Sequence, residues 1–235
     1  MLFVHEVHDV VGEHERAFED AYREGWMPAL ADGEDARLLW FLHHAHGSGP
    51  AYNVVTITAV RDGDAYERLI GRMRAGDLHE WTRSVDAMRH RVQGKVLLPV
   101  EWSPLQEVDF DEVPTDGAEH ELSLYMEDTG WPTAPLDDYI AFWDEQYYRI
   151  MRRTPPDQAL LRIDACFQPA LATHRRPEAT LVQRIMDHRL LANLITEPEE
   201  YDPDTWPGSY MHGGLRLRDQ WESKLLRTSS WSPVY

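Results

Sequence analysis

Two short stretches with the same spacing constrain this chain more than any other feature. Lys95 is followed by six residues and then Trp102-Ser-Pro, and Lys224 is followed in the same way by Trp231-Ser-Pro. Both the lysines and the tryptophans lie 129 residues apart, and these lysines are the only two in the 235-residue chain. A fixed period with matched residues at the end of each half indicates a tandem repeat of one structural unit.

Strand and helix patterns alternate through the first half. Alternating or β-branched apolar runs predict strands, over residues 2–10, 38–44, 52–60 and 96–102. An apolar stripe predicts a helix over 12–30. Asp64 is expected to cap a second helix through Met73, and helical spacing continues from Leu78 to Val92. The predicted order is therefore βαββαβ.

The second half repeats this order. Strands are predicted over 122–126, 160–168, 180–186 and 229–234, and helices over 136–151 and 215–225. Residues 191–206, with proline and acidic side chains, are expected to be partly irregular. We divide the chain into a first repeat (1–106), an acidic linker (107–120) and a second repeat (121–235).

The βαββαβ order is that of a ferredoxin-like unit, with helices on one face of an antiparallel sheet. The other sheet face must also be covered, because it carries apolar side chains. The predicted fold is therefore α+β, with two ferredoxin-like repeats that face their sheets together in a dimeric-type α/β barrel within one chain. In the alternative arrangement each half pairs with another chain, which would make the protein a homodimer.

Composition narrows the function classes. The chain carries 41 acidic and 23 basic residues, a formal charge of −18, so nucleic acid and membrane partners are disfavoured. One cysteine, Cys166, excludes an internal disulfide and gives no zinc pattern. The N-terminus has no signal-peptide pattern, and no apolar run approaches membrane-spanning length. We expect a cytoplasmic protein.

Alternation along the strands predicts which side chains face a cavity between the two sheets. Ser123, Tyr125 and Glu127 are assigned to the cavity, as are Arg162, Asp164 and Cys166. Leu161, Ile163, Ala165 and Phe167 are assigned to the helix side. In the first half, Trp40, His44 and His46 share one face with Leu38 and Leu42, and His5 corresponds to Tyr125.

Aromatic walls with a few polar groups suit a flat organic ligand. We therefore predict Trp40, Tyr125, Arg162 and Asp164 as substrate-binding residues. His5 and His44 are the predicted catalytic residues, because histidine titrates near neutral pH. Structural interpretations stand beside these: Arg162 and Asp164 as a buried ion pair, and the histidines as satisfied core or rim residues.

The stretch FLHHAHGSGP, residues 41–50, places three histidines before a glycine turn. His44 and His46 share a strand face and could chelate one metal, but a third ligand is needed and no spacing supplies it. His43 points the other way. We expect no metal site. The sequence contains no phosphate-binding glycine loop, nucleophile elbow or zinc-protease motif.

Several stretches of the first half carry a family resemblance. LFVHEVHDV, GWMPAL, ARLLWFLHHAHGSGPAYNVVT and GKVLLPVEWSPL resemble the ring-opening oxygenases of angucycline biosynthesis, from the jadomycin, gilvocarcin and kinamycin pathways. The wider plan resembles dimeric α/β-barrel proteins of the antibiotic-biosynthesis monooxygenase and NIPSNAP type. The resemblance covers most of residues 1–106 and, more loosely, the second half.

This resemblance implies an oxidoreductase that cleaves the B ring of a polycyclic aromatic angucyclinone with O2. The electrons would come from reduced flavin (FADH2 or FMNH2), supplied as a diffusible co-substrate by a flavin reductase, or from a hydroquinone substrate. Three alternatives remain open. They are a non-redox polyketide cyclase or isomerase, an aromatic small-molecule binding protein, and a haem protein with an axial histidine.

Overall fold

Alternating side chains along strand β1, Leu2–Val10, place its two faces in two different cores. Phe3 and Val7 point into the lumen of a barrel, together with His5. Val4 and Val10 point outward, under a layer of helices. Because both faces of β1 are covered, its polar side chains His5 and His8 are buried and require partners.

Antiparallel strands close into this barrel in the computed structural model, which describes residues 1–155, 157–171, 176–197 and 210–235. Around it the order is β1-β3-β2-β8-β5-β7-β6-β4. The other strands are β2 Ala36–His44, β3 Asn53–Val60, β4 Arg89–Pro99, β5 Leu124–Pro132, β6 Leu161–Leu171, β7 Ala179–Ile185 and β8 Arg218–Thr228. Strands β1 to β4 and β5 to β8 form two half-sheets, joined where β2 pairs with β8 and β4 with β6. The expected α/β barrel is confirmed.

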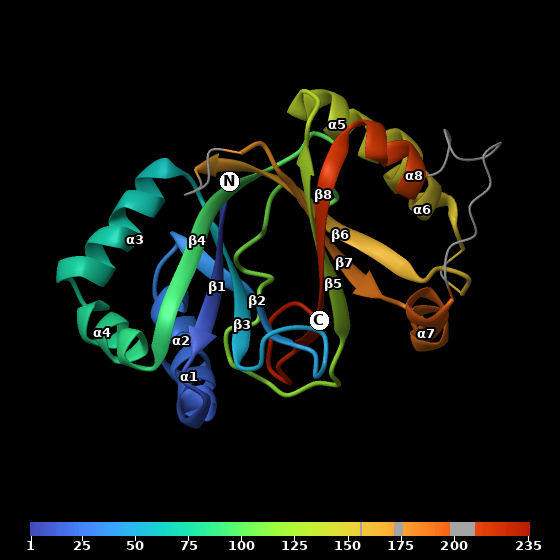
Figure 1. The fold of residues 1–235 in the computed structure, drawn as a ribbon. Coiled ribbons are helices and arrows are strands. Elements are labelled where there is room, and N and C mark those ends of the chain that lie inside the picture. The colour runs from blue at the N-terminus through green and yellow to red at the C-terminus, as the bar shows by residue number, and fades with distance from the viewer. Residues whose placement is uncertain (156, 172–175, 198–209) are drawn as a thin grey trace.

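Helices cover two opposite outer sides of the barrel, one for each half of the chain (Figure 1). The first half contributes α1 Glu15–Asp20, α2 Met27–Ala31, α3 Gly63–Ala75 and α4 His79–Ala87. The second contributes α5 Leu136–Trp143, α6 Arg149–Arg153, α7 His188–Thr196 and α8 Tyr210–Gly213. None of the described helices is long and apolar enough to cross a membrane.

The two Trp-Ser-Pro motifs make matching contacts, each with the opposite half of the chain. The Ser103 hydroxyl accepts a hydrogen bond from the Cys166 amide of β6 (2.9 Å), and the Ser232 hydroxyl accepts one from the Phe41 amide of β2 (3.1 Å). Trp102 donates to the Ile140 carbonyl of α5, whereas Trp231 donates to the carboxylate of Glu19 in α1. The repeated motif is therefore a reciprocal clasp between the halves.

Both lysines of the repeated stretches point into the lumen. Lys224 donates to Glu127 (2.7 Å), whose other oxygen lies 2.6 Å from His5 Nε2. Lys95 donates to Glu178 (2.8 Å). Burial raises the pKa of Glu127, but His5 and Lys224 outweigh it and hold this pKa well below its usual range. The carboxylate is therefore charged, and it is held between Lys224 of the neighbouring strand β8 and His5 of β1 in the other half.

The segment between the halves crosses one end of the barrel without forming a helix or strand. Its Phe110 is buried, and the guanidinium groups of Arg37 and Arg61 lie 5.2 Å from its ring centre. Such cation–π contacts stabilise an aromatic side chain at a partly wet site. The acidic segment is thus anchored over the lumen at this end.

Several element predictions for the first half need correction. Asp62, and not Asp64, caps α3, because its side chain accepts the Ala65 amide (2.8 Å). The helical spacing predicted to Val92 ends at Ala87, and β4 already begins at Arg89. Pairing of β4 with β1 down to Val10 supplies hydrogen bonds that outweigh the helical pattern of a few apolar residues.

The end of the second half was predicted wrongly. Residues 215–225 form most of β8 and no long helix, because β8 pairs with β5 from Leu124 to Pro132. Residues 229–234 are a turn and not a strand, and they carry the Ser232 contact. The first strand of this half starts at Leu124 and continues to Pro132. Part of 191–206 is helix α7, and the remainder from 198 lies outside the described residues.

Because of two β-bulges, some side chains of β2 and β6 lie on the sheet face opposite to the predicted one. A bulge between Leu38 and Trp40 leaves Leu38 under the helices, while Trp40 and Leu42 face the lumen. A bulge between Ile163 and Ala165 turns Ala165 and Phe167 into the lumen and Cys166 toward the helices. A bulge adds one residue to a strand, so every later side chain changes face. The sequence pattern contains no signal for this shift.

We expect Ser232→Ala to destabilise the protein by about 1–3 kcal/mol, because the buried amide of Phe41 loses its acceptor. Ser230→Ala is the control, since no hydrogen bond of its hydroxyl is part of the clasp. Urea denaturation of the three proteins measures the difference. Equal midpoints for the Ser232 and Ser230 variants would contradict the clasp.

We expect Glu127→Ala to destabilise the protein by about 3–5 kcal/mol, because Lys224 and His5 remain in the lumen without their carboxylate. The control is Glu119→Ala, which removes an exposed pair with Arg23 and should cost about 1 kcal/mol or less. Both values come from chemical unfolding at pH 7. A Glu127 variant as stable as the control would show that the lumen ion pairs are dispensable.

Candidate functional site

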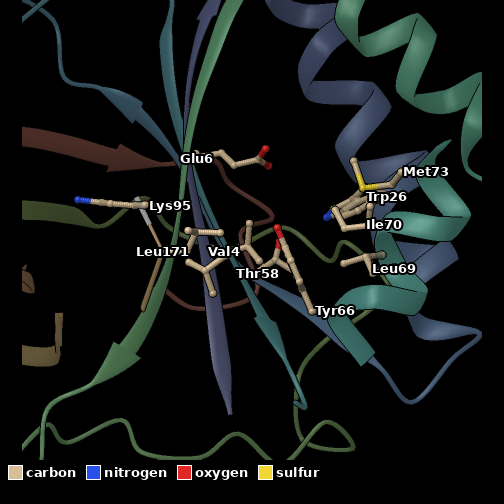
Figure 2. Close-up of a pocket in the computed structure, with 12 residues that line it drawn as sticks. Val4, Glu6, Trp26, Thr58, Tyr66, Leu69, Ile70, Met73, Lys95 and Leu171 are labelled. Carbon is tan, nitrogen blue, oxygen red and sulfur yellow. The ribbon is translucent and has the colours of Figure 1, made fainter. Parts of the chain in front are cut away.

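A cleft of about 360 Å³ lies between the outer face of the first half-sheet and the helices that cover it (Figure 2). Its floor is formed by side chains of β1, β3 and β4, including Val4, Thr58 and Val96. Tyr66 and Met73 line it from α3, and Leu171 stands at its edge, two-thirds exposed. Most of the lining is apolar, which suits a flat, largely apolar molecule.

Trp26 forms an aromatic wall of the cleft, and its position depends on an irregular helix. A π-helical turn, Ala21–Trp26, separates α1 from α2. Such turns are rare and are frequently found at functional sites. The helix of the second half carries a π-helical turn at the corresponding place, Asp144–Tyr148, between α5 and α6. The irregularity therefore recurs where each half packs its first helix on its sheet.

Glu6 is the acidic group of the cleft. Figure 2 shows its carboxylate leaving β1 on the helix side, whereas Lys95 leaves the neighbouring strand on the opposite side. Burial raises the pKa of Glu6, the charge of Arg89 opposes this effect, and Asp86 adds to it. A carboxyl with a raised pKa in an apolar cleft is a candidate for proton transfer.

Behind Glu6, contacts with His8 and Asp86 hold the guanidinium of Arg89 in place. The guanidinium of Arg89 donates to His8 Nδ1 (2.7 Å) and also contacts the carboxylate of Asp86. Because Nδ1 accepts this bond, Nε2 carries the proton and donates to the hydroxyl of Thr56 (3.0 Å). Burial and the charge of Arg89 hold the pKa of His8 well below its usual range. His8 is therefore a neutral donor.

The matching layer of the second half is filled by aromatic rings around a buried carboxyl. Asp128 accepts a hydrogen bond from Gln183 (2.7 Å), whose amide oxygen is bonded by the hydroxyl of Tyr147. Tyr139 and Trp143 pack beside them with ring centres 4.7 Å apart. Burial raises the pKa of Asp128 to about 6, and the nearby Glu127 charge contributes. In this layer, aromatic rings therefore enclose a hydrogen-bonded polar group that contains one ionisable carboxyl, that of Asp128.

The four predicted substrate-binding residues lie together, but at one end of the barrel and not in the cleft. Tyr125 donates to Asp164 (3.3 Å), and Arg162 Nε donates to the same carboxylate (2.7 Å). Trp40 meets the Tyr125 ring edge-on at 6.4 Å. Trp40, Arg162 and Asp164 line an open hollow of about 500 Å³ beneath the acidic segment. Arg162 is exposed, so its ion pair with Asp164 is not the fully buried one of the structural interpretation.

The two predicted catalytic histidines occupy the lumen. His5 is buried against Glu127, and burial lowers its pKa although the Glu127 charge opposes this. His5 also lines a polar hollow of about 250 Å³ with Lys95 and Lys224. His44 is partly buried, and burial together with the charge of Lys224 lowers its pKa. Neither histidine lines the cleft of Glu6.

His43 points toward the helices as expected. Its ring nitrogens lie 3.4 Å and 3.3 Å from the carboxylates of Glu15 and Glu19, and Nε2 contacts the Ser229 hydroxyl. In the described residues, no three histidine, cysteine or acidic side chains gather closely enough to hold a metal ion.

The cleft residues were not predicted as a site from the sequence. Trp26 belongs to the helix predicted over 12–30 from its apolar stripe, and Glu6 was given no role. The prediction placed the ligand between the two sheets, where packed rings of Phe3 and Phe167, 4.8 Å apart, now lie. The available signal was Glu6 itself, an acidic residue on the face of β1 that also carries Val4 and Val10.

Comparison with solved structures supports the fold. Two structures named "putative monooxygenase" align over nearly the whole chain. The one from Lactobacillus acidophilus NCFM has a TM-score of 0.60 and 10% identity, and covers 99% of this chain and 97% of its own. That from Fusobacterium nucleatum has a TM-score of 0.56 and 6% identity, and covers 97% and 91%.

An anthrone oxidase-like protein aligns with a TM-score of 0.60 and 8% identity, covering 97% of this chain and 91% of its own. No family model and no curated protein matches the sequence. At such low identity these likenesses establish a shared barrel fold.

Asp128 makes stability depend on pH. Its pKa is 3.8 when exposed and about 6 in the folded protein, so the unfolded chain releases this proton first as pH rises. The contribution of Asp128 is greatest below about pH 4 and falls by about 3 kcal/mol by pH 7. Asp128→Asn should remove this fall, which urea denaturation at pH 4.5 and 7 of both proteins measures. Parallel pH profiles for the two proteins would refute the assignment.

Proposed function

We propose that the protein is an oxygenase that binds a flat aromatic phenol in the cleft of the first half, with Glu6 accepting the phenolic proton. The observation that carries this proposal is a carboxyl with a raised pKa inside a cleft walled by Trp26, Tyr66 and Met73. The solved structures with the same fold that are named as monooxygenases and as an anthrone oxidase-like protein support the reaction class.

Deprotonation by Glu6 makes the substrate reactive toward oxygen. The phenolate transfers an electron to O2, and the two radicals combine to form a carbon–oxygen bond. The proton held by Glu6 then returns to the peroxide oxygen, which gives a substrate hydroperoxide without loss of any atom. General base catalysis of this kind contributes about 10²–10⁴-fold to a rate.

The volume of the cleft limits which electron donor can be bound together with the substrate. At about 360 Å³ it is at the small end of the range for drug-sized ligands, so it accommodates one fused ring system at a time. A reduced flavin and a polycyclic substrate would have to use it in turn. We therefore favour a hydroquinone form of the substrate as the electron donor, with reduced flavin acting as a diffusible reductant of the free quinone.

The proposed substrate class is a polycyclic aromatic phenol of the angucyclinone type, and the proposed outcome is oxidative cleavage of its B ring. This narrower proposal rests on the resemblance of residues 1–106 to ring-opening oxygenases. We also propose that the two halves are diverged copies of a ferredoxin-like unit. Their matched Trp-Ser-Pro contacts and π-helical turns support it.

Oxygen uptake with an angucyclinone hydroquinone tests the function, with product mass measured under ¹⁸O2. We expect enzyme-dependent uptake and incorporation of ¹⁸O, reduced by about 10²–10⁴-fold in Glu6→Gln. The raised pKa of Glu6 places the rising limb of kcat/KM above the pH expected of an exposed glutamate, and Glu6→Gln should abolish this limb.

Tyr125→Phe is the matched variant, because Tyr125 is buried in the barrel, bonded to Asp164, and does not line the cleft. It should retain the wild-type rate. Loss of activity in Tyr125→Phe, with full activity in Glu6→Gln, would move the reaction to the barrel. Substrate consumed without oxygen uptake would identify a cyclase or isomerase instead.

A further inference from the structure

We propose that Trp26 and Trp81 form a one-electron relay that carries oxidising equivalents from the cleft to the protein surface. The relay rests on the proposed function, since it serves a cleft in which oxygen forms radicals. It goes beyond that function because it gives a role to residues that do not contact the substrate's reacting atoms.

The two indoles are in direct stacking contact. Trp26 lines the cleft and is 4% exposed, and its ring lies 4.6 Å from that of Trp81 with an interplanar angle of 18°. Trp81 belongs to α4, outside the cleft lining, and is partly exposed. One stacked step therefore connects the interior of the cleft with the solvent.

A glycine in the π-helical turn makes this stacking possible. A Cβ atom on Gly25 would lie 2.7 Å from Cδ1 of Trp81 and 2.8 Å from its Nε1. Real Cβ atoms do not approach so closely, so any other residue at this position would displace the indole. The Trp81 N–H donates to the Ala21 carbonyl (2.9 Å), which holds the ring in place.

Tyr22 is the competing end point, and its surroundings exclude it. Its ring lies 5.3 Å from Trp81 and 6.3 Å from Trp26. Oxidation of a phenol requires a base for its proton, but the nearby His8 Nε2 already carries a proton, because Nδ1 accepts from Arg89. Burial also raises the pKa of Tyr22 far above its usual range. An indole loses an electron without losing a proton at once, so the oxidising equivalent passes to Trp81.

The electrons balance with a peroxyl-class radical as oxidant and a small thiol as reductant. The radical in the cleft takes one electron from Trp26 and one proton from Glu6, and becomes a hydroperoxide. Trp26 regains an electron from Trp81, whose radical cation keeps its indole proton on the Ala21 carbonyl. The Trp81 radical cation then takes one electron from the thiolate form of the thiol, and two thiyl radicals combine to a disulfide.

Without the relay, such a radical would attack the oxidisable groups that line the cleft with Trp26, namely Tyr66 and the thioether of Met73. The relay moves the oxidising equivalent away from these side chains.

The chain offers a selective way to place an oxidant at the cleft. Leu171 lines the cleft edge and is 66% exposed, whereas the single natural cysteine, Cys166, is fully buried. An anthraquinone maleimide coupled to Leu171→Cys therefore labels one position. A laser flash produces its triplet state, which takes one electron from a neighbouring indole. Transient absorption then follows the tryptophan radical without substrate or oxygen.

We expect a prompt and long-lived tryptophan radical in the labelled parent protein. Trp26→Phe should remove most of the prompt signal. Trp81→Phe should retain the prompt signal but shorten its lifetime several-fold, because the oxidising equivalent stays beside the reduced quinone. Gly25→Ala should shorten it likewise while keeping both indoles.

Trp102→Phe is the control, because Trp102 stacks on Tyr148 of the second half and does not line the cleft. This variant should behave as the parent. An undiminished prompt signal in Trp26→Phe, or an unchanged lifetime in Trp81→Phe, would overturn the relay. Neither result would affect the oxygenase proposal, which depends on oxygen uptake and on Glu6.

Discussion

Each four-stranded half of this protein has a sheet face that water would wet if the other half did not cover it. The covering is reciprocal: β2 pairs with β8, β4 pairs with β6, and Ser103 and Ser232 each bind an amide of the opposite half. Burial of the two apolar faces supplies the main driving force, and the serines fix the register. Neither half-sheet is complete without the other, so the two halves are expected to fold as one cooperative unit.

Closing the barrel has a consequence for function. Once large rings fill the lumen, a flat ligand has little room between the sheets, and the charged groups there are paired with one another. Above the other face of the first half-sheet, the helix contains a π-helical turn, and a cleft lies beside Trp26. The same β1 strand thus turns the buried imidazole of His5 to the lumen and the carboxyl of Glu6, whose pKa burial raises, to the cleft.

The two halves differ at corresponding places. Where the first half has its cleft, the second packs Tyr139, Trp143 and Tyr147 around Asp128. Each layer has an ionisable group on the first strand of its half, Glu6 in the first and Asp128 in the second. Of these two described residues, Glu6 is the one that lines a cleft. Such a difference would allow one half to carry the proposed site while the other contributes stability.

The sequence alone determined the strand and helix order of the first half, the repeat period and the barrel, because these depend on local periodicity and on covering apolar faces. It assigned Trp40, Tyr125, Arg162 and Asp164 to the barrel side of their strands, where they do lie together, because alternation assigns each side chain to one face of its own strand. The facing of Leu38 and of the residues after the bulge at Asp164, the strand over 218–228, and the location of the cleft were decided only by the tertiary structure. In each case, pairing or packing with residues distant in the sequence, or the insertion of one residue in a strand, outweighs the local pattern that a sequence shows.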